Sequence, residues 1–225
     1  MLFLDHTLIL LIPAVLLSLF AQWKVKSTFN KYAQVRSARG MSGAEAAQAM
    51  ARAERVPVSV EAGQGYLSDH FDPRTDSLVL SPEVYAGRSL SSLGVAAHEL
   101  GHALQKKTGY APLALRSGLV PLANFGSQFS MILFFAGLFM GAEPLQTAGI
   151  VLFSLAVLFA LVTLPVEFDA SARAVRVLQT HGVITDSEVP AVKKVLNAAA
   201  LTYVAAAVTA ILTLLRLVLL ARSDD

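Results

Sequence analysis

The sequence predicts a mainly helical integral membrane protein, with four transmembrane segments and a cytoplasmic α+β domain that contains a small β-sheet. Its 225 residues are 55% hydrophobic and only 15% charged, whereas a soluble domain carries about 25% charged residues. The mean hydropathy is +0.58. Four long apolar runs alternate with two polar regions, and the first polar region holds short alternating segments that are typical of strands.

The first apolar run, residues 4–23, is predicted to be a transmembrane helix that is retained in the mature protein. A signal peptide would carry positive charge before the run and a small-residue cleavage site after it. Here the acidic Asp5 precedes the continuous apolar stretch, and Trp23, Lys24 and Lys26 follow it. An aromatic and basic exit is typical of a helix anchored at the bilayer surface.

The first polar region, residues 24–118, is predicted to begin with a helix over residues 42–53. Ser42 and Glu45 have the spacing of a capping box, in which each side chain bonds the backbone of the other residue.

Two strands are predicted next in this region, at residues 56–60 and 77–81, because apolar and polar residues alternate there. The sequence between them is rich in turn-forming residues. Pro82 is predicted to open a short helix, since proline is favoured in the first helical turn.

Three more apolar runs, residues 119–141, 145–166 and 198–221, are predicted to span the membrane. Each has the roughly 20 residues that a spanning helix needs. A tight turn at residues 141–144 joins the first two into a hairpin, and residues 167–197 form the second polar region.

Basic residues predict that both polar regions face the cytoplasm. They flank the membrane in both polar regions, whereas the turn at residues 141–144 carries only Glu143. Arg216 and Arg222 near the end of the last segment argue against this orientation. Two spans separate the polar regions, so these regions share one side of the membrane in either orientation.

The chemistry is predicted to centre on His98-Glu99-Leu100-Gly101-His102. Positions i and i+4 of a helix lie on the same face one turn apart, so His98 and His102 can bind one metal ion. Zinc lowers the pKa of a bound water, and Glu99 is placed to take its proton as general base. The alternative is an amphipathic helix with two histidines one turn apart, but the apolar flanks favour a motif helix buried beneath a cleft.

The composition also excludes several classes of site and partner. The chain has no cysteine, so disulfides, thiol catalysis and cysteine-type zinc sites are excluded. A metal must therefore be held by His, Glu or Asp. The net charge of +2 gives no reason to expect nucleic-acid binding, and the predicted partners are the lipid bilayer and a polypeptide substrate.

Glu167 is predicted to be the third metal ligand. An extended motif with a third histidine would need it at position 108, which is Thr108. Glu167 stands where the third span enters the side of the membrane that holds the motif. Alanines at alternate positions over 170–174 make the following helix thin enough to pack against the motif helix. The alternative is that Glu167 and Asp169 mark the membrane boundary and pair with Arg173.

Five stretches together resemble the YugP-like family of neutral zinc metallopeptidases, which are bacterial membrane proteins. They are residues 27–32, 69–73, 94–103, 107–112 and 164–168, and the resemblance runs nearly end to end. It implies a zincin-like domain, one zinc ion per chain and a multi-pass location in the bacterial plasma membrane.

More distantly, the architecture is similar to the HtpX-like and CAAX prenyl protease metallopeptidases, which combine H-E-x-x-H with a later E-x-x-x-D. In those families the glutamate binds zinc and the aspartate orients a zinc histidine. Glu167 matches the glutamate, which implies a gluzincin-like site. The aspartate position is Ser171 here, so Asp169 and Ser171 are both candidates for the hydrogen bond to a histidine.

The predicted function is a membrane-embedded zinc metalloendopeptidase that cuts membrane or membrane-proximal proteins. Residues 77–81 are the candidate edge strand for binding the substrate backbone. His70 is a candidate oxyanion donor; its alternative is a turn histidine held by neighbouring carboxylates. The alternative function is a non-proteolytic membrane scaffold or adaptor with a structural zinc site, which needs four protein ligands and would have to recruit His70.

Overall fold

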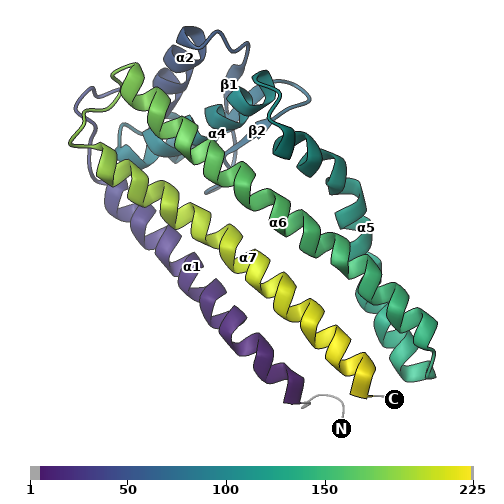
Figure 1. The fold of residues 1–225 in the computed structure, drawn as a ribbon. Helices are drawn as coiled ribbons and strands as arrows, with labels where there is room; N and C mark the ends of the chain where they lie inside the picture. Colours follow the sequence, from purple (N-terminus) through teal and green to yellow (C-terminus); the bar gives the residue numbers. More distant parts are fainter. Residues whose placement is uncertain (1–5, 224–225) are drawn as a thin grey trace. The chain divides into compact units, whose positions relative to one another are not determined.

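The computed structural model describes residues 6–223, so the start of the predicted first span, with Asp5, lies outside the described residues. Within them the chain is mainly helical, with one three-stranded sheet and four helices long and apolar enough to cross a membrane. The chain divides into two compact units (Figure 1). One holds the apolar segments and the other the polar regions.

The membrane-spanning unit (residues 6–22, 114–165 and 202–223 of the described chain) holds the apolar parts of four long helices, which extend beyond the predicted spans and continue into the second unit. They are α1 (Leu11–Ala33), which the 3₁₀ turn His6–Leu10 precedes, α5 (Ala111–Met140), α6 (Glu143–Thr180) and α7 (Val189–Ser223). Within this unit Ser18 and Thr209 hydrogen-bond between α1 and α7 at 3.3 Å. Between α5 and α6, a Cβ at Gly149 would lie 2.7 Å from the backbone of Ser130 and Phe134, so only glycine permits this close packing.

The hairpin between the second and third spans is shorter than predicted. Helix α5 ends at Met140 and α6 begins at Glu143. Gly141 has φ of +61°, a left-handed conformation that glycine adopts freely. Helix α5 begins at Ala111, eight residues before the predicted start of the second span at residue 119.

The second unit, which we call the motif unit, comprises residues 23–113 and 166–201, so it includes the polar ends of α1, α6 and α7, and its first complete helix is α2 (Gly43–Ala53). The predicted capping box is confirmed: the Ser42 hydroxyl accepts from the backbone N–H of Glu45, and the Glu45 carboxylate accepts from that of Ser42. The predicted start at Pro82 is also confirmed, since Pro82 opens α3 (Pro82–Tyr85). The motif lies on α4 (Leu90–Lys107).

The sheet differs from the prediction in three respects. Its strands are β1 (Ser59–Ala62), β2 (His70–Asp72) and β3 (Ser77–Leu80), in the order β1-β3-β2. Strand β1 starts later than predicted, and β2 lies within the stretch that was predicted as turns. Strand β3 pairs with β1 in parallel and with β2 in antiparallel. The interpretation of residues 77–81 as an edge strand is therefore wrong, because both edges of β3 are already paired.

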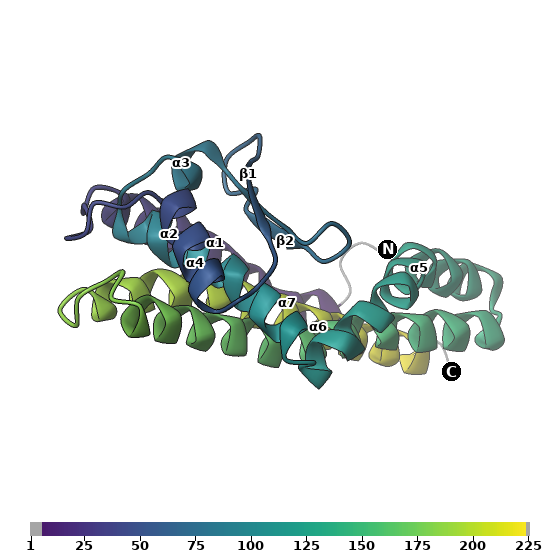
Figure 2. The same ribbon diagram turned by 90° about the horizontal axis from the view of Figure 1, so that it is seen from above.

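The core of the motif unit forms around α4. Figure 2 shows α4 between the sheet and the polar end of α6, and α4 contacts α2, β2 and β3. Leu93, Ala96, Ala97 and Leu100 are fully buried on it. Its last turn carries Lys106 and Lys107, which suit the negative end of the helix dipole. This apolar packing holds the motif helix as a rigid base for the polar side chains.

Candidate metal centre

The motif helix α4 has a defined start. The hydroxyl of Ser89 accepts from the backbone N–H of Ser92 at 3.1 Å, which caps the first turn. In the same turn, the buried Ser91 donates to the carbonyl of Phe29 at 2.8 Å. These bonds fix the register of α4 within the motif unit and so the direction in which His98 and His102 point.

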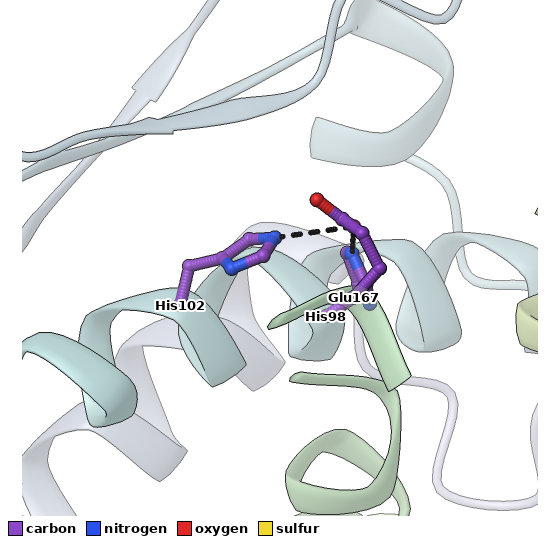
Figure 3. A group of neighbouring side chains, drawn as sticks. All are labelled: His98, His102 and Glu167. Carbon is purple, nitrogen blue, oxygen red and sulfur yellow. Dashed lines mark hydrogen bonds and ion pairs between the residues drawn. The ribbon is translucent and has the colours of Figure 1, made fainter. Parts of the chain in front are cut away.

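The side chains of His98 and His102 converge on Glu167 (Figure 3). The Nε2 atom of His98 lies 3.2 Å from Glu167 Oε2, and that of His102 lies 3.6 Å from the same oxygen. The two imidazole rings are nearly perpendicular, at 84°. The Glu167 side chain is only 2% exposed. The structure thus brings all three predicted ligands into one cluster in which each offers an atom within 4.8 Å of the others.

Glu167 reaches this cluster because α6 passes very close to α4. A Cβ on Gly101 would lie 2.5 Å from the carbonyl oxygen of Ala170, so a side chain at Gly101 would force the helices apart. Ala170 and Ala174 are fully buried, as the prediction of a thin packing helix requires, whereas Ala172 is exposed. Small residues on both helices therefore bring the carboxylate to the two histidines.

The other ring nitrogen of each histidine has its own hydrogen-bond partner. Nδ1 of His98 lies 3.1 Å from the Ser171 hydroxyl, and Nδ1 of His102 lies 3.0 Å from Gln105 Oε1. Of the two candidates for this position, Ser171 thus contacts a histidine directly. Asp169 reaches a histidine only indirectly. The Gln105 amide nitrogen donates to the Asp169 carboxylate at 2.9 Å, and the Gln105 oxygen faces His102.

These residues fit a zinc ion. Two nitrogen or oxygen ligands about 2.1 Å from a tetrahedral zinc lie roughly 3.4 Å apart, close to the 3.2 Å and 3.6 Å between each histidine Nε2 and Glu167 Oε2. Two imidazoles and a carboxylate form a common set for a catalytic zinc site. Partners at Nδ1 are the usual outer support of histidine ligands.

The electrostatics of the cluster also favour a cation. Burial lowers the pKa of His102, but the hydrogen bond to Glu167 and the charges of Glu99 and Glu167 outweigh burial, so the pKa of His102 is raised overall. A pocket that stabilises a positive charge on an imidazole can stabilise a bound metal ion in the same place.

Glu99 is buried next to the cluster, at 8% exposure. Its charge acts on His102 and also on Asp69, a residue at the end of the loop between β1 and β2. Burial raises the pKa of Asp69, and the charge of Glu99 adds to this effect, against hydrogen bonds from Ser81 that lower it. The Asp69 carboxylate accepts from the backbone N–H of Ser81 at 2.7 Å and from its hydroxyl.

The structure does not bring the other histidines of the motif unit into the cluster. His70 lies exposed on β2, with Nδ1 2.9 Å from the carbonyl of Ser68. His181 pairs with Glu54 at 2.8 Å. Thr108, at the position where an extended motif would have its third histidine, caps the end of α4.

Two residues of the site were not identified from the sequence. Gln105 follows His102 by three positions, a spacing that puts both on one helix face, so its contact could have been inferred from α4 alone. Asp69 comes close to Glu99 only through the tertiary fold, and no local pattern indicates that proximity.

Comparison with known proteins gives consistent matches along the chain. Residues 7–222 match the model of a family described as "Putative neutral zinc metallopeptidase". The chain is 47% identical, over 212 residues, to a Bacillus subtilis (strain 168) protein named "Putative membrane protease YugP", and the match covers 94% of each chain. No solved structure matches.

Proposed function

This chain belongs to the family of neutral zinc metallopeptidases that its sequence matches over residues 7–222, and on that premise we propose that it is a membrane-embedded zinc-dependent metalloendopeptidase. Glu167 comes immediately after the apolar run that is predicted to span the bilayer, so the site lies close to the membrane. Its proposed substrates are therefore membrane or membrane-proximal polypeptides. The observation that carries the proposal is the convergence of His98, His102 and Glu167 on one point.

In the proposed site, His98, His102 and Glu167 would hold one zinc ion per chain. The chemistry that bound zinc supplies is a lowered pKa of a water molecule and polarisation of the peptide carbonyl. Glu99 takes the proton of the attacking water as general base and then passes it to the leaving amine. Its burial beside His102 supports this role.

The substrate backbone is proposed to pair with β2 rather than with β3. Strand β2 is an edge of the sheet and contacts α4, which carries the motif. An extended peptide that adds to this edge would pass the cluster with its backbone held by hydrogen bonds. His70 lies on this strand, and we keep the prediction that its ring donates a hydrogen bond to the oxyanion.

The charge pattern supports an assignment of the site to one side of the membrane. Lys24, Lys26, Lys106 and Lys107 flank the spans on the motif side, whereas the short turn between α5 and α6 carries only Glu143. The positive-inside rule supports a cytoplasmic site in the plasma membrane of a bacterium.

The alternative of a non-proteolytic scaffold with a structural zinc site finds less support. A structural site is closed by four protein ligands, whereas a catalytic one keeps a position open. Among residues 6–223 the side chains grouped for metal binding are His98, His102 and Glu167. His70, the candidate for a fourth ligand, has its Nδ1 against the Ser68 carbonyl instead.

The test compares wild-type protein with Glu99→Gln in zinc content and in cleavage of casein or of the chain itself. We expect Glu99→Gln to keep its zinc and to lose about 100-fold to 10,000-fold in cleavage rate, the range for a lost general base. Glu83→Gln, an exposed glutamate on α3, is the matched control. Full activity in Glu99→Gln would contradict the mechanism, and absence of cleavage by the wild type would favour the scaffold.

A further inference from the structure

We propose that Gln105 is a positioning residue that fixes the ring of His102, and that Asp169 and Arg173 fix Gln105 in turn. The proposal rests on the proposed function, since it assigns a role around the same zinc site. It concerns how firmly the chain holds the metal, which is measurable without any substrate.

Gln105 is fully buried in the motif unit and uses both ends of its amide. Its oxygen faces His102 Nδ1 at 3.0 Å. Its nitrogen donates to the carbonyl of Val166 at 2.7 Å and to Asp169 Oδ2 at 2.9 Å. Each of these hydrogen bonds goes to a proposed metal ligand or to a residue near one. A glutamine that only filled space in the core would not need them.

These contacts determine which way round the amide lies. The carbonyl of Val166 and the carboxylate of Asp169 only accept hydrogen bonds, so the NH₂ group must face them. The amide oxygen must then face His102. Because that oxygen also only accepts, Nδ1 of His102 must carry a proton.

A protonated Nδ1 leaves the lone pair of a neutral imidazole on Nε2. This is the atom that lies 3.6 Å from Glu167 Oε2, on the side where a metal ion would bind. Gln105 thus selects the one neutral tautomer of His102 that can act as a ligand through Nε2.

Asp169 and Arg173 complete the support from α6. Arg173 Nε donates to Asp169 Oδ2 at 2.5 Å, and its NH1 group donates to the Thr108 hydroxyl at 3.0 Å. The guanidinium also lies over the ring of Tyr110, 5.5 Å from its centre. Arg173 therefore ties the carboxylate that orients Gln105 to the end of the motif helix, and the network returns to α4, where it began.

The experiment measures zinc affinity of the full-length protein in detergent by chelator competition, with the visible spectrum of the cobalt-substituted protein as a second readout. Gln105→Met keeps the volume and removes every hydrogen bond. We expect it to bind zinc about 10-fold to 100-fold more weakly, the range for a lost outer partner, and to alter the cobalt spectrum. Gln146→Met, at a buried glutamine of the membrane-spanning unit, is the control and should change neither.

A double exchange separates positioning from general loss of stability. Gln105→Glu puts a carboxylate against Asp169 and the Val166 carbonyl and should weaken zinc binding. Adding Asp169→Asn restores a donor between the two side chains, so the double variant should bind zinc more tightly than Gln105→Glu alone. If it does not, or if Gln105→Met keeps wild-type affinity and spectrum, the proposal is overturned.

The two proposals fail in different ways. A wild-type protein that binds zinc but cleaves nothing contradicts the peptidase function, while the affinity series still tests Gln105. Normal cleavage by the wild type together with unchanged affinity in Gln105→Met contradicts only the role of Gln105. A wild type without zinc overturns both.

Discussion

His98 and His102 stand one turn apart on α4 and face the same carboxylate, but different kinds of partner hold them. The Nδ1 atom of His98 is supported from α6 by the hydroxyl of Ser171. His102 is supported from its own helix by Gln105, a fully buried amide that is itself bonded to Val166 and Asp169. Ser171 is half-buried and lines a groove of about 640 Å³ on the polar ends of α6 and α7.

The difference indicates how each ring is controlled. A hydroxyl can donate or accept, so Ser171 leaves the tautomer of His98 open and lies where water can replace it. The amide of Gln105 has one possible orientation and imposes one neutral tautomer on His102. We infer that His102 is the preorganised ligand and that His98 adjusts to the metal.

The largest effect is expected from the residue that both histidines share. Glu167→Ala removes the carboxylate that faces both Nε2 atoms and should lower zinc affinity by more than the roughly 100-fold that a lost outer partner costs. Glu143→Ala, at the opposite end of the same helix and exposed, is the control. Stoichiometric zinc in washed Glu167→Ala protein, measured by atomic absorption, would show that Glu167 is not a ligand.

A smaller effect is expected at Ser171. Ser171→Ala removes one hydrogen bond near a groove, so zinc affinity should fall by about threefold to tenfold, less than for Gln105→Met. Ser171→Asp should raise the affinity above wild type, because a charged acceptor fixes Nδ1–H on His98. The comparison between the two histidines breaks down if chelator competition finds the Ser171→Ala loss equal to or larger than the Gln105→Met loss.

The smallest effect is expected in the pH dependence of stability at Asp69. Burial raises its pKa above the ordinary 3.8, so the folded state holds the proton more tightly than the unfolded state. The stability that this provides is complete below the ordinary value and is lost as the pH rises through the folded pKa. As the pH is raised from about 4 to about 7, the melting temperature of Asp69→Asn in detergent should therefore fall less than that of the wild type.

Asp72 supplies the control for that measurement. Hydrogen bonds from Arg74 lower its pKa from the ordinary 3.8 to about 2, so its contribution to stability is lost as the pH falls from the ordinary value through about 2. That contribution is therefore nearly constant over the tested interval. Asp72→Asn should follow the wild-type curve in shape. An Asp69→Asn curve with that same shape would contradict the role given to burial.

Much of the fold could be predicted because its signals are local. The capping box at Ser42 and the proline at the start of α3 each depend on a few neighbouring residues, and both are confirmed. The four apolar runs also correspond to helices long enough to span a membrane. Strand β2 was missed because its three residues sit among turn-forming ones, and only pairing with β3 makes them a strand. Because β2 pairs with β3 on the side opposite β1, β3 is the central strand of the sheet and not an edge.

The candidate site divides in a similar way. Helical spacing alone places His98 and His102 together, and the count of spans returns Glu167 to their side. The Gln105 contact was within reach of the same spacing argument but carries no motif. The approach of Asp69 to Glu99 depends on how the loop after β1 packs, which no single stretch of sequence encodes.

In the proposed site, the chain supplies three zinc ligands and keeps one position open. Anomalous diffraction at the zinc edge, from crystals of the zinc-loaded protein, tests this arrangement most directly. We expect a single strong peak within bonding distance of His98 Nε2, His102 Nε2 and Glu167, and of no fourth protein side chain. A peak that His70 or another side chain also ligates, or one located away from these three residues, would contradict this arrangement.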